Sequence, residues 1–370
     1  MSLTDQEKNR YSRHILLEEV GLAGQEKLKA AKVLVIGAGG LGCPVLQYLT
    51  AAGVGTIGII DFDRVDATNL QRQILYTVGD IGKNKAITAK NRLTQLNPHI
   101  NFDVYPEKLT TKNALELFSK YDMVVDGTDN FSTRYLVNDA CVISNKPLIY
   151  GAIYKFEGQV SVFNYEQGPT YRCLFPEPPK AGSVPNCSDV GVIGVLPGLI
   201  GTQQANEVIK LILEIGAPLS GKLLTYDLLN NSFLTLKVNR SEEEIQKVLS
   251  NSDDFENMDY DLFCGISIEN DLKEITKEDL KSMLDSSDDF QIVDVRGEWE
   301  QPRIDISTSL NGQLLIAPLN DLGSYVDKIS KNKKVIVVCQ HGIRSAAAIE
   351  HLESEYDFKN LINLENGLAN

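Results

Sequence analysis

The chain has 370 residues, of which 43% are hydrophobic and 23% are charged, so it is long enough for two domains that each bury a core. No apolar run approaches the roughly 20 residues that a membrane span needs, and the polar N-terminal stretch MSLTDQEKNRYSRH is unlike a secretory signal. The six cysteines are scattered and form no dense framework, which suits a reducing compartment. We therefore expect a cytoplasmic protein with free thiols and no membrane partner.

The net charge of −14 is unevenly distributed along the chain. Residues 1–240 hold 24 Lys and Arg against 23 Asp and Glu, a net charge of +1, whereas residues 241–370 hold 12 against 27, a net charge of −15. This shift predicts a domain boundary near residue 240. Neither part has the basic excess of a nucleic-acid-binding protein, so we expect no nucleic-acid partner.

Strands alternate with helices in the first part of the chain. After one or two short helices within residues 5–31, compact apolar runs alternate with segments of helical periodicity as far as residue 153. We expect strands at 32–37, 56–61, 100–106, 122–129 and 147–153, and helices at 39–55, 82–98, 110–121 and 130–144. Such alternation is typical of an α/β fold of Rossmann-like type, with a doubly wound, mostly parallel sheet.

The pattern changes after residue 155. We expect a strand at 158–165, a long loop rich in Pro and Gly at 168–191, a helix at 198–216, and a β-hairpin that turns at Asn230-Asn231. Residues 241–270 are acidic and polar and are interpreted as a linker. From residue 271 a second, shorter alternation contains the strands FQIVDVR and KVIVV, which predicts a smaller α/β domain. The domains are therefore expected at 1–240 and 271–370.

A glycine-rich segment, GAGGLG, lies between the first strand and the helix that follows it. Gly37, Gly39, Gly40 and Gly42 would let a phosphate or a ribose approach the backbone, and a helix N-terminus favours anionic groups. Asp61 ends the second strand, where an acid can bind the hydroxyls of a ribose. Taken alone, these features would also fit an NAD-dependent dehydrogenase.

Charged and carboxamide side chains follow the other strands of this sheet. Asn69 and Arg72 follow the second strand, Lys85 lies further on, and Asp129 and Asn130 come at another strand end. In an open α/β sheet, the strand ends and the loops after them line one ligand crevice. Two cations and a carboxylate there suit a triphosphate with Mg²⁺, where catalysis is mainly positioning and charge neutralisation. A dehydrogenase has no need of this set.

Four segments carry a specific resemblance to a known family. They are VLVIGAGGLGCPVLQYLTAAGVGTIGIIDFDRVDATNLQRQ, DGTDNFSTRYLVNDAC, FEGQVSVF and YRCLFP. From about residue 5 to 240, the chain resembles the adenylyltransferases that activate ubiquitin-like sulfur carriers, within the ubiquitin-activating superfamily. The resemblance implies that ATP adenylates the C-terminal Gly-Gly carboxylate of a small carrier protein and that pyrophosphate leaves.

The resemblance also implies roles for single residues. The residues implied to bind ATP are Gly40 at the phosphates, Asp61 at the ribose, and Asn69, Arg72 and Lys85 at the triphosphate. Asp129 would hold Mg²⁺, with Asn130 beside it. Arg13 resembles an arginine that enters the ATP site of a neighbouring subunit, so a homodimer is implied.

The carrier protein is left open by the sequence. The preferred hypothesis is the small subunit of molybdopterin synthase, and the alternatives are a carrier of thiamine biosynthesis or of tRNA thiolation. A dehydrogenase with an inert C-terminal module is the alternative from a different class of enzyme. Arg72, Lys85 and Asp129 argue against it, because they suit a triphosphate.

Two cysteine features of the family are altered or ambiguous here. Members usually carry a structural zinc on two C-x-x-C pairs, but the corresponding segments are TYRC and DLFC, so Thr170 and Asp261 stand where cysteines would be. Cys173 and Cys264 alone remain, and because zinc prefers four ligands, a stable zinc site is not expected. Cys187, in the segment PNCSDVG, matches the cysteine that takes the carrier as a thioester or an acyl disulfide in some relatives, or is an ordinary loop cysteine.

The C-terminal part has a different candidate chemistry. The segment CQHGIRS, from Cys339 to Ser345, follows a strand and precedes a helix, and VDVRGEWE contains Asp294, Arg296 and Glu298. A turn of this length can point its backbone N–H groups at a sulfur, and Arg344 adds a positive charge. Over about residues 271–370 the chain resembles a rhodanese-like domain, which implies a persulfide on Cys339 and a separate persulfide donor. The two domains together would then deliver sulfur to the adenylated carrier as a thiocarboxylate.

Overall fold

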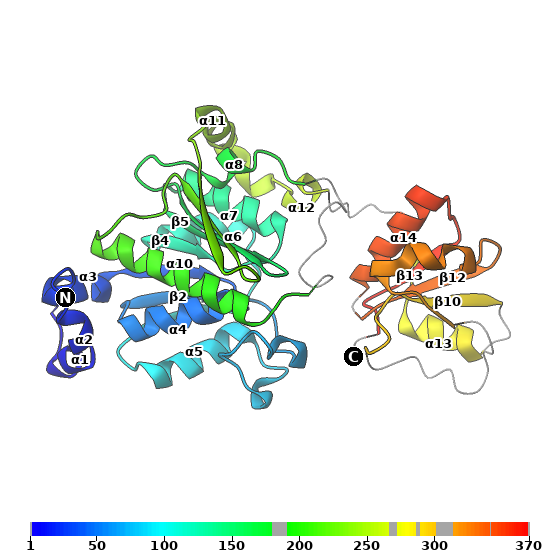
Figure 1. Ribbon diagram of the computed structural model, residues 1–370, viewed down its shortest axis with the longest axis horizontal. Coiled ribbons are helices and arrows are strands. Elements are labelled where there is room, and N and C mark those ends of the chain that lie inside the picture. Colours follow the sequence, from blue (N-terminus) through cyan, green and yellow to red (C-terminus); the bar gives the residue numbers. More distant parts are fainter. Residues whose placement is uncertain are drawn as a thin grey trace. The chain divides into compact units, whose positions relative to one another are not determined.

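The computed structural model describes residues 2–179, 191–265, 272–285, 289–300, 314–340 and 342–368 (Figure 1). The chain divides into two compact units, Met1–Ile266 and Ser267–Asn370, and each unit is described by itself. No helix within the described ranges is both long and apolar enough to cross a membrane.

The described part of the first unit contains a sheet of eight strands in the order β3-β2-β1-β4-β5-β6-β7-β8. The strands are β1 (Lys32–Ile36), β2 (Thr56–Ile60), β3 (Asn101–Tyr105), β4 (Met123–Asp126), β5 (Leu148–Tyr154), β6 (Glu157–Phe163), β7 (Lys222–Asp227) and β8 (Ser232–Lys237). Strands β1 to β5 are parallel, whereas β5 to β8 pair antiparallel. This sheet confirms the predicted Rossmann-like fold, and the predicted hairpin joins β7 to β8 through Asn231, whose φ is +54°.

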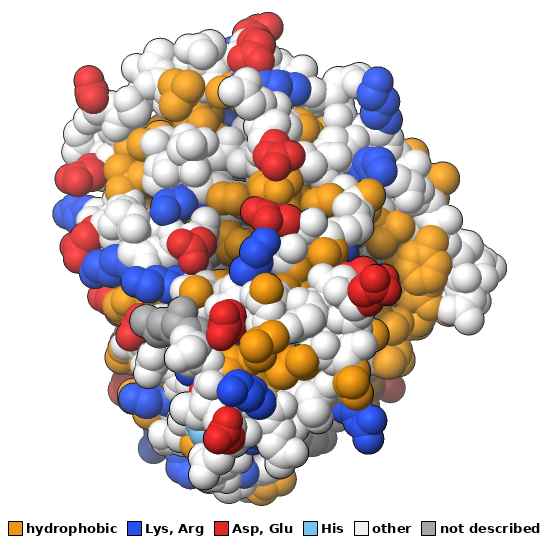
Figure 2. Space-filling view, turned by 90° about the vertical axis from the view of Figure 1, so that its left-hand side faces the viewer, with side chains coloured by type: hydrophobic (Ala, Val, Ile, Leu, Met, Phe, Trp, Pro, Cys, Tyr) orange, Lys and Arg blue, Asp and Glu red, His pale blue; other side chains and the backbone are white. Residues whose placement is uncertain are grey.

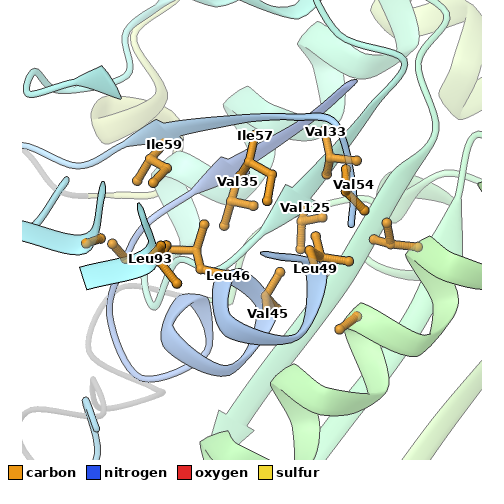
Figure 3. Packing of buried hydrophobic residues seen from close by; sticks show 14 of the residues in the cluster. Val33, Val35, Val45, Leu46, Leu49, Val54, Ile57, Ile59, Leu93 and Val125 are labelled. Atoms are coloured by element: carbon orange, nitrogen blue, oxygen red, sulfur yellow. The ribbon is translucent and has the colours of Figure 1, made fainter. Parts of the chain in front are cut away.

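Helices cover both faces of this sheet. They are α1 (Asp5–Arg10), α2 (Ser12–Ile15), α3 (Gly21–Ala30), α4 (Gly42–Ala52), α5 (Lys85–Leu96), α6 (Thr111–Ser119), α7 (Phe131–Ile143), α8 (Tyr171–Leu174), α10 (Val195–Leu213), α11 (Glu242–Ser250) and α12 (Tyr260–Phe263), with the 3₁₀ helices η1 (Ala67–Asn69), η2 (Val78–Asp80) and η3 (Ser252–Asn257). In β1, Val33 and Val35 belong to the core that includes α4, α5 and α10, whereas Leu34 and Ile36 belong to the core that includes α6 and α7. Successive side chains of a strand point to opposite faces, so an unbroken apolar run is buried on both sides. Figure 3 shows Val33 and Val35 facing the side chains of α4.

The described part of the expected linker, 241–270, is folded into the first unit. Its helices α11 and α12 contact α7, and Ile245, Val248 and Tyr260 are buried. Ile245 and Val248 are three residues apart and so share one face of α11, which packs on the sheet unit. The acidic residues occupy the other positions of these short helices. The prediction of a linker was therefore wrong for this part, because it weighed the charge and overlooked the apolar spacing.

The second unit is a smaller parallel α/β structure, as predicted. Its described strands lie in the order β11-β10-β12-β13-β9, and all the pairs are parallel. Its elements are β9 (Glu274–Ile275), α13 (Lys277–Asp285), β10 (Phe290–Asp294), β11 (Leu314–Ile316), η4 (Leu319–Lys328), β12 (Lys334–Val338), α14 (Ile343–Tyr356) and β13 (Leu361–Leu364). The sequence predicted β10 and β12, which are the buried apolar runs. It did not predict β9, β11 and β13, which are two to four residues long and lie at or near the sheet edges.

A pair of alanine substitutions on α11 tests whether this helix belongs to the first unit. Ile245→Ala removes a side chain that is 4% exposed and should lower the free energy of unfolding of the full chain by about 2–4 kcal/mol. Leu249 lies on the same helix but is 38% exposed, so Leu249→Ala should lower the free energy of unfolding by well under half of that amount. Chemical denaturation followed by far-ultraviolet circular dichroism measures both. Equal, small effects of the two substitutions would be the behaviour of a loose linker.

Candidate active site

A cavity of about 640 Å³ opens at the carboxyl ends of β1, β2 and β4. It is lined by eight of the residues that the sequence singled out for a nucleotide: Gly37, Gly39, Gly40, Asp61, Arg72, Lys85, Asp129 and Asn130. These residues come from five separate stretches of sequence. The parallel strands bring them together because their carboxyl ends share one edge of the sheet.

The glycine-rich turn forms one wall of this cavity. Gly37 has φ +88°, a backbone conformation that residues with a side chain rarely adopt. A Cβ placed on Gly42 would lie 1.9 Å from the carbonyl oxygen of Gly37, so α4 can begin this close to β1 only with glycine at that position. The result is an exposed stretch of backbone, which includes Gly39 and Gly40, at the N-terminal end of α4.

Asp61 is held at the end of β2 by two backbone donors. The N–H groups of Ala38 and Asp63 each donate a hydrogen bond to its carboxylate, both at 2.8 Å. Burial raises the pKa of Asp61, while the charge of Lys85 opposes that rise. The carboxylate is therefore fixed in orientation beside the glycine-rich turn, where it could accept hydrogen bonds from ribose hydroxyls.

Two cations lie on the cavity wall. Lys85 is the first residue of α5, its side chain is 7% exposed, and its Nζ lies 2.9 Å from a carboxylate oxygen of Asp63. The guanidinium of Arg72 donates to the carbonyl oxygen of Thr68 at 3.1 Å. The methylene stem of Arg72 lies against Gly40, since a Cβ on Gly40 would be 3.7 Å from Arg72 Cδ. A positive charge thus lies next to the exposed backbone of the turn.

Asp129 and Asn130 have different surroundings, although they are neighbours in sequence. Asn130 is the N-cap of α7, and its side-chain oxygen accepts the Thr133 N–H at 2.9 Å. Asp129 is exposed on the cavity wall. Nearby Asp126 is buried, which raises its pKa, and it accepts two hydrogen bonds from Thr128. Asp129 is thus the carboxylate of this strand end that faces the cavity, and an exposed oxygen donor fits Mg²⁺ bound jointly with phosphates.

Two residues that the resemblance placed at the nucleotide lie outside the cavity lining. Asn69 ends η1, and its side-chain oxygen accepts the Asp66 N–H at 3.2 Å. Arg13 is exposed on α2, among the N-terminal helices. Within one copy of this unit, the described residues that line the cavity include neither side chain.

The cavity also contains residues that the sequence did not single out. Gln73 follows Arg72 in the same motif and is buried, and its side-chain oxygen has no hydrogen-bond partner in the described part of the chain. Ser132, Leu136 and the segment 258–261 also line the cavity. Gln73 and Ser132 could have been found by extending the motifs by one or two residues. No local signal marks 258–261, because only the tertiary fold brings that segment to the site.

The structure does not bring Cys173 and Cys264 into one metal site. The thiol of Cys173 accepts hydrogen bonds from the N–H groups of Thr170, at 3.3 Å, and Ser241, at 3.2 Å. Ser241 therefore lies beside the Cys173 sulfur. Cys264 instead lies in the core with Tyr260. Nowhere in the described ranges do three or more His, Cys, Asp or Glu side chains form a group that could hold a metal ion. This arrangement does not fit tetrahedral zinc, and Cys187 lies outside the described residues.

Cys339 lies at the end of β12 in the second unit and is 1% exposed. The N–H of Gly342 donates to its sulfur at 3.1 Å, and the hydroxyl of Ser345 donates at 3.3 Å. Gly342, with φ +84°, is the N-cap of α14. The turn thus directs a backbone donor and a hydroxyl at the sulfur, beside the positive end of a helix, which suits an anionic sulfur.

Two arginines stabilise the residues around this turn through hydrogen bonds and an ion pair. Arg296 is fully buried and donates to both oxygens of Asp294 at 3.0 and 2.9 Å, and to the side chain of Gln340, next to Cys339 in sequence, at 2.9 Å. Arg344 makes a two-pronged ion pair with Glu300 at 2.8 and 2.7 Å. Burial would raise the pKa of Glu300, but the hydrogen bonds from Arg344 and from the Gly297 N–H lower it. The charge of Arg344 is therefore shared with a carboxylate, which the sequence interpretation did not include.

Comparisons with known proteins match each part of the chain to a different family model. The model of the ThiF family matches residues 11–247, and the model of the rhodanese-like domain matches residues 276–370. The chain is 51% identical to a sulfur carrier protein adenylyltransferase of Thermus thermophilus, over 72% of this chain and all of that protein. It is 41% identical, over all of this chain and 93% of that protein, to a probable adenylyltransferase/sulfurtransferase, MoeZ, of Mycobacterium tuberculosis.

Solved structures show the same architecture in the first unit. The crystal structure of E. coli MccB with ATP is 26% identical, with a TM-score of 0.57, over 65% of this chain and 73% of that one. The resemblance drawn from the sequence is thus confirmed, and the family match favours an adenylyltransferase over the dehydrogenase alternative. The chain belongs to the ThiF family and carries a rhodanese-like domain in its C-terminal part.

Proposed function

We propose that this enzyme uses ATP to adenylate the C-terminal Gly-Gly carboxylate of a small ubiquitin-like sulfur carrier, and then delivers sulfur from Cys339 to form a thiocarboxylate. The observation that carries the proposal is the gathering of Arg72, Lys85 and Asp129 in the one cavity that the glycine-rich turn lines. The names of the relatives support it, since they include sulfur carrier adenylyltransferase and adenylyltransferase/sulfurtransferase. The small subunit of molybdopterin synthase remains the preferred carrier. The names of two relatives fit that choice: MoeZ, and the adenylyltransferase and sulfurtransferase MOCS3 of Culex quinquefasciatus, which is 42% identical over 95% of this chain and 83% of that protein.

The cations act on the adenylation step. A carboxylate oxygen of the carrier attacks the α-phosphorus of ATP, a new O–P bond forms, and the bond to the bridging oxygen of pyrophosphate breaks. The electron pair leaves with pyrophosphate, so negative charge grows on the departing group. Arg72 and Lys85 would neutralise that charge without reorganisation, because the structure already holds both side chains in place. When bound, Mg²⁺ at Asp129 would add charge neutralisation at the phosphates.

The sulfur step needs a nucleophile that carries a transferable sulfur atom. The terminal sulfur of a Cys339 persulfide would attack the carbonyl carbon of the adenylate, so that a C–S bond forms and the C–O bond to AMP breaks. The product is an acyl disulfide with Cys339. A second thiol that attacks the Cys339 sulfur would release the thiocarboxylate and leave a disulfide. Cys187 is the chain's candidate for that thiol. An external dithiol reductant would then open the disulfide and itself be oxidised, and an external persulfide donor would reload Cys339.

A homodimer is part of the proposal. Figure 2 shows the side of the first unit that carries α1 to α3, with hydrophobic side chains grouped among charged ones. Leu16, Leu17 and Leu22, on and beside these helices, are 73%, 52% and 45% exposed. A second copy that covered these leucines would also bring its exposed Arg13 close to this unit. That would explain why Arg13 lies outside the cavity of its own chain.

Charge-removing substitutions test the adenylation site. Arg72→Ala and Asp129→Asn should each lower carrier-dependent ATP–pyrophosphate exchange by about 10²–10³-fold, because each removes charge that acts on the phosphates. Lys120→Ala is the matched control, since Lys120 is an exposed cation outside the cavity lining, and its exchange rate should stay unchanged. Near-normal exchange in both site variants would contradict the assignment.

A second prediction separates sulfur transfer from adenylation. Cys339→Ser should leave pyrophosphate exchange unchanged, because that step needs only ATP, Mg²⁺ and the carrier carboxylate. It should abolish the carrier thiocarboxylate, because a serine hydroxyl cannot hold transferable sulfur. Both products are followed in the same samples by mass spectrometry, with a persulfide donor present and free sulfide excluded. Thiocarboxylate at the wild-type rate would show that sulfur reaches the carrier by another route.

Mixing inactive variants tests the contribution of Arg13 across a dimer. The Arg13→Ala and Arg72→Ala variants should each show weak pyrophosphate exchange when assayed alone. Random reassortment makes half of the dimers mixed, and one of the two sites in each mixed dimer has both arginines. Exchange should therefore recover to about a quarter of the wild-type rate. Analytical ultracentrifugation checks that dimers form, and dimers without recovery would show that Arg13 serves no partner site.

A further inference from the structure

We propose that residues 258–261 form the wall of the nucleotide cavity that receives the purine base of ATP. The inference rests on the proposed function, because it assumes that the cavity binds ATP. Met258, Asp259, Tyr260 and Asp261 all line the cavity. The ThiF match ends at residue 247 and the rhodanese-like match begins at residue 276, so neither family model covers this wall.

The charges along the cavity indicate which part of ATP meets this segment. Arg72 lies against the glycine-rich turn and Lys85 pairs with Asp63, so the phosphates belong there. Asp259 and Asp261 are acidic and would repel a triphosphate. A neutral base is the part of the nucleotide that this side of the cavity can accept without an electrostatic cost.

The side chains around Met258 form an apolar slot that suits the faces of a purine. Leu109, Leu136 and Tyr260 belong to one buried hydrophobic cluster, and Met258 packs against it. All four of these residues also line the cavity. Apolar side chains suit the two faces of an aromatic ring, and the thioether of methionine adapts its shape to such a ring. The slot thus presents apolar area where a base needs it.

One polar side chain is available for the edge of the base. Ser132 and Leu136 are four residues apart and therefore lie on the same face of α7, which lines the cavity. Ser132 is 6% exposed, and the partner of its hydroxyl in the described part of the molecule is the thiol of Cys264, not a nitrogen or an oxygen. A thiol is a weak hydrogen-bond partner, so the ring nitrogen or amino group of a purine would give this hydroxyl a stronger one.

Hydrogen bonds hold this segment against the rest of the first unit. The hydroxyl of Tyr260 donates to Asp139 at 2.8 Å, and the same carboxylate accepts two hydrogen bonds from Arg172, both at 2.7 Å. The hydroxyl of Thr111, at the start of α6, donates to the carbonyl oxygen of Glu256 at 2.8 Å. These contacts fix the wall in place before a base arrives, so little ordering entropy is lost when the nucleotide binds.

The decisive measurement compares ATP with a ligand that has phosphates but no base. We would measure the Kd of the full chain for ATP and for inorganic tripolyphosphate by isothermal titration calorimetry. Met258→Ala should raise the Kd for ATP about tenfold, from the loss of apolar contact with the base, and leave the Kd for tripolyphosphate unchanged. Ser132→Ala should give a smaller rise for ATP, again with no change for tripolyphosphate.

Leu262→Ala is the matched control. Leu262 lies on the same short helix as Tyr260, is 64% exposed and is outside the cavity lining, so both constants should equal those of the wild type. A wild-type Kd for ATP in Met258→Ala, or equal losses for both ligands, would overturn the inference. If the wild-type chain does not bind ATP, whether or not it binds tripolyphosphate, the proposed function fails as well. The wild-type measurement therefore distinguishes a failure of the proposed function from a failure of the base-binding wall alone.

Discussion

The nucleotide cavity depends on one close approach of backbone to backbone. The carbonyl oxygen of Gly37 occupies the space where a side chain on Gly42 would be, so the first turn of α4 begins directly beside the end of β1. That approach exposes the turn, and it leaves the N–H of Ala38 free to hold Asp61 at 2.8 Å. Any side chain at Gly42 would move α4 and release Asp61 together, so the phosphate and ribose positions are one structural feature.

A second constraint is the buried charge pair of Asp139 and Arg172. Arg172 lies over the rings of Tyr135 and Phe263, 4.8 Å from each ring centre, and Tyr260 completes the bonds to Asp139. Breaking such a pair leaves an unpartnered buried charge, which costs about 3–5 kcal/mol. The pair ties α7, α8 and α12 together. Hydrogen bonds around Cys173 complete the junction with α11.

Sequence reasoning succeeded where the signal is local. Alternating apolar runs predicted the parallel sheet. Asp61, Arg72 and Lys85 were singled out from their order after the strands and from the family motif, and they lie together in one cavity. It failed where distant segments meet. Ser241 lies opposite Cys173, 68 residues away, and no spacing rule predicts that contact. Glu300 pairs with Arg344 across 44 residues, and Met258 reaches the cavity only because Tyr260 and Phe255 are buried behind it.

Both candidate sites contain a strand-to-helix turn with a left-handed glycine, but the two turns create different surroundings. Gly37 and Gly342 both have a left-handed backbone, at φ +88° and +84°, in turns that join a parallel strand to a helix. The first turn lines a cavity of about 640 Å³ with cations nearby, which an ATP molecule can enter. The second turn encloses a sulfur that is 1% exposed. Adenylation needs an accessible, charged surface, whereas a persulfide must be shielded from water and stray thiols. One pocket cannot meet both needs, which gives a physical reason for placing the two reactions in separate units of one chain.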